Sequence, residues 1–207
     1  WDTLARVEPE ERIAVTGGGE RVAFDALVIA CGALAREPLR GALTFRGRDD
    51  VSALRELLAE LDSGSARSVA FALPSERMWP LPLYELALLT AGHVREHGRR
   101  AKRLALVTPE DTPLELFGPE AERAIGPLLE ARGIELRCSS LPAVVEPRAL
   151  VLAGGAKVYV DRVVTLPTLE GPRIAGLPHD ADGFIPVDLS GRVVGLSDVY
   201  LSLIHIS

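Results

Sequence analysis

The sequence lacks the features that mark disulfide-bonded, zinc-binding or membrane-spanning proteins. Its 207 residues include two cysteines, Cys31 and Cys138, which lie far apart and outside any CxxC spacing. This pattern argues against a disulfide framework and a zinc site and indicates a reducing compartment. No window approaches the roughly 18 to 20 uninterrupted apolar residues of a membrane helix. We therefore expect no transmembrane segment.

A basic stripe is missing as well. The net charge is -6, and the 23 lysines and arginines are scattered among 29 acidic residues. Such a pattern offers no surface that could track a phosphate backbone, so no nucleic-acid partner is expected. With 47% hydrophobic and 25% charged residues, the chain is typical of a folded protein, long enough for one large domain or two small ones.

The N-terminal part of the sequence predicts a β-meander followed by a buried strand. The glycines at 17–19 can supply the positive φ values that a tight turn needs. Short strands are expected before and after that turn, over residues 3–7, 12–16 and 21–24. The apolar run 26–30, which is soon followed by Gly32, is typical of a strand buried on both faces.

A linker and an amphipathic helix are expected next. Residues 38–47 are predicted to be extended, and the helix is predicted to begin near Asp49 or Asp50 and to end before Gly64. The apolar residues of this helix fall on one stripe: Val51, Leu54, Leu57, Leu58 and Leu61.

From residue 66 onward the sequence predicts a βαβαβ unit. Three strands and two helices alternate over residues 68–74, 82–98, 103–110, 118–133 and 134–140. The second helix is expected to be interrupted at Gly126 and Pro127. Right-handed crossovers would place the three strands in one parallel sheet, whose ligands bind beyond the carboxyl ends of the strands. A hairpin about Gly154 and Gly155, a strand at 161–167 and a short strand at 183–188 complete the prediction.

This order of elements, together with two short phrases, resembles a known group of flavoproteins. The phrases are FDALVIACGA at 24–33 and DGFIPVDLSGRVVGLSDVY at 182–200. They resemble the pyridine nucleotide-disulfide oxidoreductase superfamily, in particular its branch of type II NADH dehydrogenases and sulfide:quinone reductases. The resemblance implies an α/β fold: a three-layer, Rossmann-like domain with a parallel sheet plus β-meander, and an incomplete portion of a second, FAD-binding domain.

The resemblance also implies a division into domains. A partial FAD-binding domain with linker is expected at 1–47, an NAD(P)-binding-like domain at 48–166, and a return segment at 167–200. In the family the phrase DVYA continues into AGD, whose aspartate binds FAD, whereas LSLIHIS follows here at 201–207. That heptapeptide resembles a translated sequencing adapter, so we expect a non-native tail and a chain truncated at both ends. The alternative is a native terminal strand.

The resemblance assigns candidate FAD-binding residues to the N-terminal part. Ala30, Cys31, Gly32 and Ala33 match the family's ATG turn near the flavin pyrophosphate, with Cys31 in the place of threonine. The hydroxyl group is thereby lost. Leu4 stands where the family's strand backbone meets adenine. The plainer alternative is that Gly32 simply ends a buried strand.

The second dinucleotide site lacks the glycine signature that the family carries. Counting back from Glu85, the three glycine positions of GxGxxGxE hold Met78, Pro80 and Leu83. Glycines there let the backbone approach a pyrophosphate, and prolines remove the donors that would bind it. NAD(P) binding is therefore expected to be altered or lost, with Pro74, Glu85 and Glu110 as the cofactor-binding candidates. Glu110 is the candidate for a ribose, and Trp79 with Met78 could shape an apolar pocket or simply pack.

The remaining histidines and Cys138 have plain structural explanations. His93 and His97 have the i, i+4 spacing of a metal pair but no third ligand nearby, which favours a solvated helix end. His179 stands among turn residues, and Cys138 is expected to be a buried small hydrophobe. No metal site and no catalytic residue are predicted.

The expected function is that of a fragment of an FAD-dependent oxidoreductase that passes electrons through flavin, from NAD(P)H to a quinone or another small-molecule acceptor. Sulfide:quinone reductases use reactive cysteines, and residues 38–66 contain none, which argues against that subgroup. The alternative is a non-catalytic nucleotide- or partner-binding module with a degenerate dinucleotide site. The resemblance implies a cytoplasmic parent protein with peripheral contact to the inner face of the membrane. The fragment alone is expected to be inactive and to retain no flavin.

Overall fold

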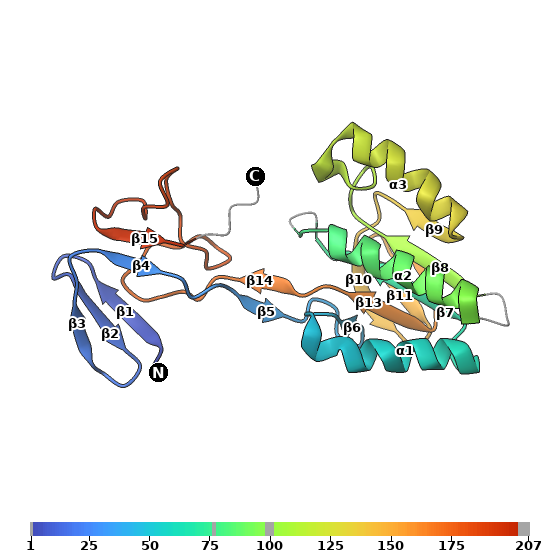
Figure 1. Cartoon of the computed structure of the whole chain (residues 1–207), viewed down its shortest axis with the longest axis horizontal. Coiled ribbons are helices and arrows are strands. Elements are labelled where there is room, and N and C mark those ends of the chain that lie inside the picture. The colour runs from blue at the N-terminus through green and yellow to red at the C-terminus, as the bar shows by residue number, and fades with distance from the viewer. Residues whose placement is uncertain (1, 76–77, 98–101, 203–207) are drawn as a thin grey trace. The chain divides into compact units, whose positions relative to one another are not determined.

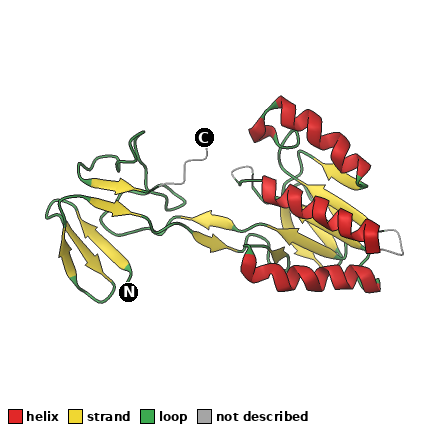
Figure 2. Ribbon diagram, viewed as in Figure 1, coloured by secondary structure: helices red, strands yellow, loops and turns green. Residues whose placement is uncertain are grey.

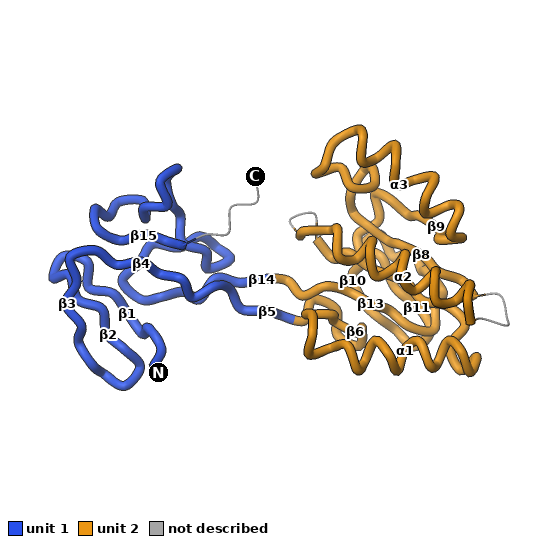
Figure 3. Tube along the Cα trace, in the orientation of Figure 1, with its two compact units in different colours: residues 1–36, 169–207 blue, residues 37–168 orange. Residues whose placement is uncertain are grey.

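The chain forms two compact units, which Figure 3 shows in different colours. The structure is a computed structural model that describes residues 2–75, 78–97 and 102–202. Unit 1 comprises Trp1–Arg36 and Leu169–Ser207, and unit 2 comprises Glu37–Thr168. The chain therefore leaves unit 1 once and returns to it once.

Unit 2 is built around a five-stranded parallel sheet with the strand order β6-β13-β7-β8-β9. Its strands are β6 (Leu43–Thr44), β7 (Ser68–Ala72), β8 (Arg103–Val107), β9 (Ile134–Arg137) and β13 (Arg162–Thr165). Every residue of β7 is buried, as expected of a central strand covered on both faces. The predicted parallel arrangement is confirmed. The expected linker 38–47 is not wholly a linker, since it contributes the edge strand β6.

Three helices cover one face of this sheet (Figures 1 and 2). They are α1 (Val51–Ser63), α2 (Leu81–His97) and α3 (Pro119–Ala131). α1 ends at Gly64, whose φ of 81° closes the helix in the left-handed conformation that glycine adopts without strain. The predicted interruption of α3 is wrong, because the helix continues through Pro127. Ile125 and Leu129 on either side of this proline are buried, and their packing offsets the lost hydrogen bond.

The opposite face of the sheet packs against a three-stranded antiparallel sheet. This sheet consists of β10 (Pro142–Glu146), β11 (Ala149–Leu152) and β12 (Lys157–Tyr159). Leu150 and Val158 pack against the alanines of β7 and β8. The hairpin predicted about Gly154 and Gly155 is confirmed, and β10 is a strand that the sequence did not reveal. Unit 2 therefore has three layers, with helices, parallel sheet and antiparallel sheet in that order.

Unit 1 contains the predicted meander and two strand pairs. The meander is β1 (Leu4–Glu8), β2 (Ile13–Thr16) and β3 (Arg21–Ala23). β4 (Leu27–Ile29) pairs in parallel with β15 (Val199–Leu201), and β5 (Leu34–Arg36) pairs with β14 (Thr168–Glu170). The expectation that β4 is buried on both faces is wrong, since Val28 is 63% exposed. Only the Ile29 side of β4 packs into the apolar core of this unit.

The segment that returns to unit 1 packs closely against the meander. The Val7 N–H donates to the Ala175 carbonyl at 2.9 Å. Gly176 follows with a φ of 84°, and a Cβ there would overlap the Val7 carbonyl oxygen. The short strand predicted at 183–188 is absent from these described residues. Val187 forms an isolated bridge with Val193 instead. Pro186 cannot donate to a ladder, which explains the missing strand.

Strand β15 includes the first residue of the expected tail. Leu201 is its last residue, and the Ser202 N–H donates to the Ile29 carbonyl at 2.9 Å. The predicted tail, 201–207, thus begins inside a strand, and its residues 203–207 lie outside the described residues. No helix in the described part of the chain is long and apolar enough to cross a bilayer.

Candidate functional site

A cleft of about 470 Å³ lies beyond the carboxyl ends of β7 and β8. Loops that follow neighbouring parallel strands meet at this edge, and this is where open α/β sheets bind ligands. The lining residues come from the loop after β7, the loop after β8 and the short helix η2 (Glu115–Phe117): Met78, Pro80, Pro109, Glu110, Asp111, Glu115 and Leu116.

Glu110 is the most constrained acid of the cleft. It is 8% exposed, and its Oε2 accepts hydrogen bonds from the Tyr84 and Thr108 hydroxyls, each at 2.8 Å. The Thr108 hydroxyl in turn accepts from the Glu110 N–H at 3.2 Å, and the Tyr84 hydroxyl accepts from the Leu114 N–H at 3.3 Å. Two donors from two elements therefore fix the orientation of this carboxylate.

Burial and the charge of Glu110 together raise the pKa of two neighbouring side chains. Burial, and then the charge of Glu110, raises the pKa of Tyr84, so its phenol remains a donor. Burial also raises the pKa of Cys138, with the carboxylates of Glu110, Asp111 and Glu122 adding to the shift. Cys138 is partly buried rather than buried as expected, and its raised pKa makes it a poor nucleophile.

The lining of the cleft carries negative charge. Glu110, Asp111 and Glu115 contribute carboxylates, and no basic residue belongs to the described lining. The Asp111 carboxylate accepts a hydrogen bond from the Ser139 hydroxyl at 3.0 Å, which holds it beside the cleft. Like charges repel, so this lining disfavours a phosphate group.

The amino-terminal end of α2 offers few backbone donors to a ligand. Pro80 and Pro82 have no N–H, and the Pro80 carbonyl accepts from the Leu83 and Tyr84 N–H groups at 2.9 and 3.4 Å. The Leu81 N–H is the backbone donor that remains in this turn. In dinucleotide-binding folds the pyrophosphate rests on such amides, so this helix end cannot hold it in that way.

The three candidates predicted in unit 2 have different positions. Glu110 lines the cleft, and Pro74 is half-buried just after β7. Glu85 is exposed on α2 and does not belong to the cleft lining, whereas the neighbouring Tyr84 points inward to Glu110. Met78 lines the cleft, and Trp79 packs its ring against Phe117 at 4.8 Å between centroids.

Sequence reasoning missed Tyr84, Thr108, Asp111 and Glu115. Thr108 and Tyr84 carried a usable signal, because each is a polar residue within an apolar stretch, and buried hydroxyl groups require hydrogen-bond partners. Asp111 and Glu115 carried none, since acidic residues in a loop are ordinary.

Four of the candidates predicted in unit 1, residues 30–33, lie at the carboxyl end of the parallel pair β4–β15, whereas Leu4 is the first residue of β1. Residues 30–33 are all exposed, and Gly32 has a φ of 67°, which favours glycine. The Cys31 sulfur lies 3.9 Å from the Gly32 carbonyl oxygen. Leu4 is half-buried and packs against the core of this unit, so only its backbone remains for a ligand.

The histidines at positions 93, 97 and 179 make structural contacts. His93 Nε2 lies 3.0 Å from Asp62 Oδ2, and the rings of His93 and His97 stack at 4.5 Å. Asp180 Oδ1 accepts from the Asp182 and Phe184 N–H groups at 2.9 Å, which makes a turn beside His179. Among the described residues, no three histidine, cysteine or acidic side chains form a group that could hold a metal.

Comparison with solved structures defines the class of fold, which is that of a group of oxidoreductases. No protein-family model matches the sequence, and no curated protein matches it. The chain is similar to the sulfide:quinone oxidoreductase of Aquifex aeolicus, with a TM-score of 0.83 and 20% identity over 97% of this chain and 50% of that one. It is also similar to the ferredoxin reductase for the CYP199A2 system of Rhodopseudomonas palustris, with a TM-score of 0.68 and 18% identity over 97% and 48%.

A third similar structure is the reduced CoADR-RHD of Bacillus anthracis, with a TM-score of 0.61 and 16% identity over 97% of this chain and 36% of that one. The chain thus spans half or less of the length of these three proteins. At such identities the likeness establishes the fold, and it confirms the predicted α/β class with its parallel sheet.

Proposed function

We propose that the chain is part of a flavoprotein oxidoreductase that passes electrons through FAD to a small-molecule acceptor. The likeness to two reductase structures over 97% of the chain, with both units included, carries this proposal. Their activities belong to those proteins, and the likeness is to about half of each. Cytoplasmic location and peripheral membrane contact of the parent protein are part of the same proposal.

The loop after β4 suits a dinucleotide cofactor. Residues 30–33 follow the carboxyl end of a parallel strand, are exposed, and include a glycine with a positive φ. Their backbone would face the pyrophosphate of FAD, and the backbone of Leu4 would lie near the adenine. FAD supplies the ring that accepts and releases electrons, while these residues supply its position.

For unit 2 we propose that NAD(P) binding is altered or lost. The prolines at the start of α2 and the acidic lining of the cleft both disfavour a pyrophosphate in the usual place. Glu110 remains the candidate for a ribose, although its Oε2 already accepts two hydrogen bonds. The electron donor would then be another reductant, or NAD(P)H bound in a different mode.

The test is to express the complete reading frame that contains these residues and to record its visible spectrum. We expect a bound flavin, and a colourless, well-folded protein would contradict the proposal. Residues 1–207 alone are expected to retain no stoichiometric flavin, and a yellow preparation of this chain would show that expectation to be wrong. Anaerobic mixing of the flavoprotein with NADH and NADPH then tests the donor, with slow flavin reduction by both as the expected result.

A second candidate function is a non-catalytic binding module. The prolines at the amino-terminal end of α2 favour this function, because they remove backbone donors from the usual phosphate site. A domain that has lost its phosphate site can still serve in recognition. Trp79, Leu116 and Phe117 are exposed beside the cleft and would provide an apolar contact surface. The same spectrum separates the two functions, since a module of this kind would carry no flavin.

A further inference from the structure

A second groove, of about 560 Å³, lies at the amino-terminal edge of the parallel sheet of unit 2. Arg67 directly precedes β7, Arg103 begins β8, and Arg148 lies in the turn between β10 and β11. The groove is lined by these three arginines and by Ser68, Pro147, Tyr159, Val160 and Asp161. Three arginines from distant parts of the chain thus line one groove.

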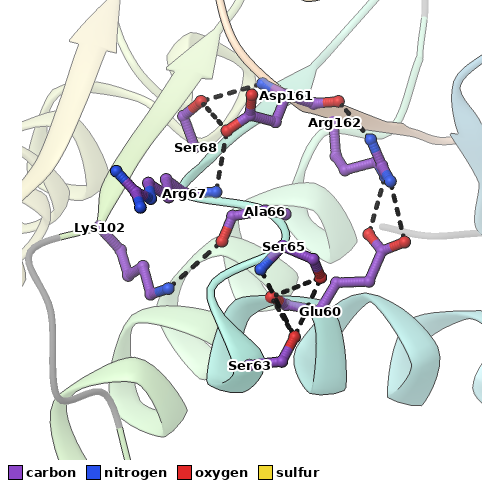
Figure 4. A network of polar contacts seen from close by, with 9 residues as sticks. All are labelled: Glu60, Ser63, Ser65, Ala66, Arg67, Ser68, Lys102, Asp161 and Arg162. Carbon is purple, nitrogen blue, oxygen red and sulfur yellow. Dashed lines mark hydrogen bonds and ion pairs between the residues drawn. The ribbon is translucent and has the colours of Figure 1, made fainter.

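Asp161 is the hydrogen-bonding centre of the groove lining, and Figure 4 shows its contacts with Arg67 and Ser68. Its Oδ2 accepts from the Arg67 N–H at 2.8 Å and from the Ser68 hydroxyl at 3.1 Å, and its own N–H donates to the Ser68 hydroxyl at 2.9 Å. These bonds join the residue before β7 to the residue before β13. They also lower the pKa of Asp161, with the Arg67 N–H as the largest cause. The backbone that carries Arg67 is therefore fixed.

The groove has more positive than negative charge, although the whole chain has a net charge of -6. Asp161 is the only acid among the described residues of its lining, and it pairs with Arg148 at 3.3 Å. Arg103 lies 3.7 Å from Glu135, at the long end of an ion pair, and its side chain is 65% exposed. Within the described residues, Arg67 makes no side-chain ion pair and is exposed. Most of the donors of these guanidinium groups are thus available.

Arg148 occupies a backbone position that glycine would fill without strain. It follows Pro147 in the two-residue connection between β10 and β11, and its φ is 63°. A proline followed by a residue with positive φ is typical of a type II turn, which favours glycine or asparagine at the second place. The conformation of the turn does not require an arginine. The turn therefore does not explain the positive charge that Arg148 brings to the groove.

We propose that this groove binds a phosphate-bearing small molecule with a planar ring, such as a nucleoside diphosphate. Guanidinium groups match phosphate oxygens with paired hydrogen bonds, and the three arginines can serve two phosphates. Tyr159 is 67% exposed and offers a ring face beside them. The volume is within the usual range for small-molecule sites. The proposal concerns the opposite edge of the sheet from the cleft and does not depend on the flavin assignment.

Calorimetric titration of the full chain with ADP at low ionic strength tests the proposal. ADP is expected to bind more tightly than adenosine or inorganic pyrophosphate, because it engages both the arginines and Tyr159. Added salt should weaken its binding, since the contacts are between exposed charges. Adenosine that binds as tightly as ADP would overturn the proposal.

Arg148→Gly is the most informative variant, because glycine keeps the turn while the charge is removed. We expect it to weaken ADP binding roughly tenfold, the usual size for one charge-assisted contact. Arg67→Gln should have a similar effect. The matched control is Arg55→Gln, which removes an exposed arginine from α1 and should leave binding unchanged. Wild-type affinity in both groove variants would overturn the proposal.

A variant in the cleft tests whether ADP binds at the carboxyl edge of the sheet instead of in the groove. Asp111→Asn removes one negative charge from the cleft and none from the groove. If ADP binds in the groove, its affinity should not change. If the affinity rises several-fold, ADP occupies the cleft and the groove proposal is wrong. The flavin assignment is tested separately by the visible spectrum, so the two failures can be told apart.

Discussion

The two edges of the parallel sheet in unit 2 carry opposite charge. The cleft beyond its carboxyl ends is lined by three carboxylates, whereas the groove at its amino ends is lined by three arginines and one aspartate. Open α/β sheets usually bind phosphates at the carboxyl edge. Strand order alone therefore does not determine where a phosphate can bind, because charge and free N–H groups also decide it.

The two edges also have a feature in common, which is a carboxylate that accepts hydrogen bonds from hydroxyl groups, joined at Asp161 by a backbone N–H. Glu110 accepts from the Tyr84 and Thr108 hydroxyls, and Asp161 accepts from the Ser68 hydroxyl and the Arg67 N–H. The difference is in burial: Glu110 is 8% exposed, and the side chain of Asp161 is 16% exposed. We therefore expect the larger mutational effects at the carboxyl edge.

Tyr84→Phe is expected to have the largest effect, a loss of about 2 kcal/mol in the free energy of unfolding. The change removes one of two donors to the buried Glu110 carboxylate and leaves the Leu114 N–H without its acceptor. Urea denaturation measures this loss. Tyr159→Phe is the control, because that side chain is 67% exposed and should lose almost nothing. Equal losses in both variants would contradict the proposed role of the Glu110 network.

Asp161→Asn should cost about 1 to 2 kcal/mol, since it weakens the acceptor of two hydrogen bonds at the amino edge. The pKa of Asp161 is lowered in the folded state, so its contribution is present above the unfolded pKa of about 3.9 and is lost as the pH falls below it. The difference between the wild type and the variant should therefore shrink in acid. A difference that stays constant from neutral pH to below about pH 3 would rule out this linkage.

Arg148→Gly should leave stability unchanged or raise it by up to about 1 kcal/mol, because glycine adopts the positive φ of this turn without strain. The same replacement at Arg55, within α1, should instead lower stability by about 1 kcal/mol. Thermal or urea unfolding of the two variants gives the comparison. A clear loss at position 148 would mean that the ion pair with Asp161 outweighs the strain.

The smallest effect is expected at Cys138. Burial is the largest cause of its raised pKa, and Asp111 contributes less than burial and Glu110. Asp111→Asn should therefore lower the pKa of this thiol slightly toward its ordinary value. The rate of thiol modification as a function of pH measures it, in a Cys31→Ser background because Cys31 is exposed. A pKa that rises on loss of this charge would contradict the described electrostatics of the cleft.

Much of the fold could be predicted from local patterns in the sequence. The buried run of β7, the stripe of α1 and the glycine hairpin between β11 and β12 all follow from residue periodicity and turn chemistry. The strands β6, β14 and β15 could not be predicted, because each has only two or three residues and pairs with a distant segment. Such strands depend on tertiary context more than on their own composition.

Less of the two candidate sites could be predicted. Glu110 was identified from its place at the end of a strand. The prolines at the start of α2 were identified because they stand near the positions of the missing glycines. The partner role of Tyr84 depends on the packing of α2 against β8, which no spacing reveals. The groove was invisible for the same reason, since Arg67, Arg103 and Arg148 are separated by dozens of residues and look scattered in the sequence.

The division of unit 1 into two separate stretches has a consequence for the order of folding during synthesis. Its core combines Val7 and Ile29 from one stretch with Ile174 and Val199 from the other, whereas unit 2 is continuous from Glu37 to Thr168. A ribosome synthesises the whole of unit 2 before it begins the second stretch of unit 1. Domains generally fold as units as they emerge. The meander strands can pair with one another at once, whereas β4 and β5 can pair with β15 and β14 only after the unit inserted between them has been synthesised.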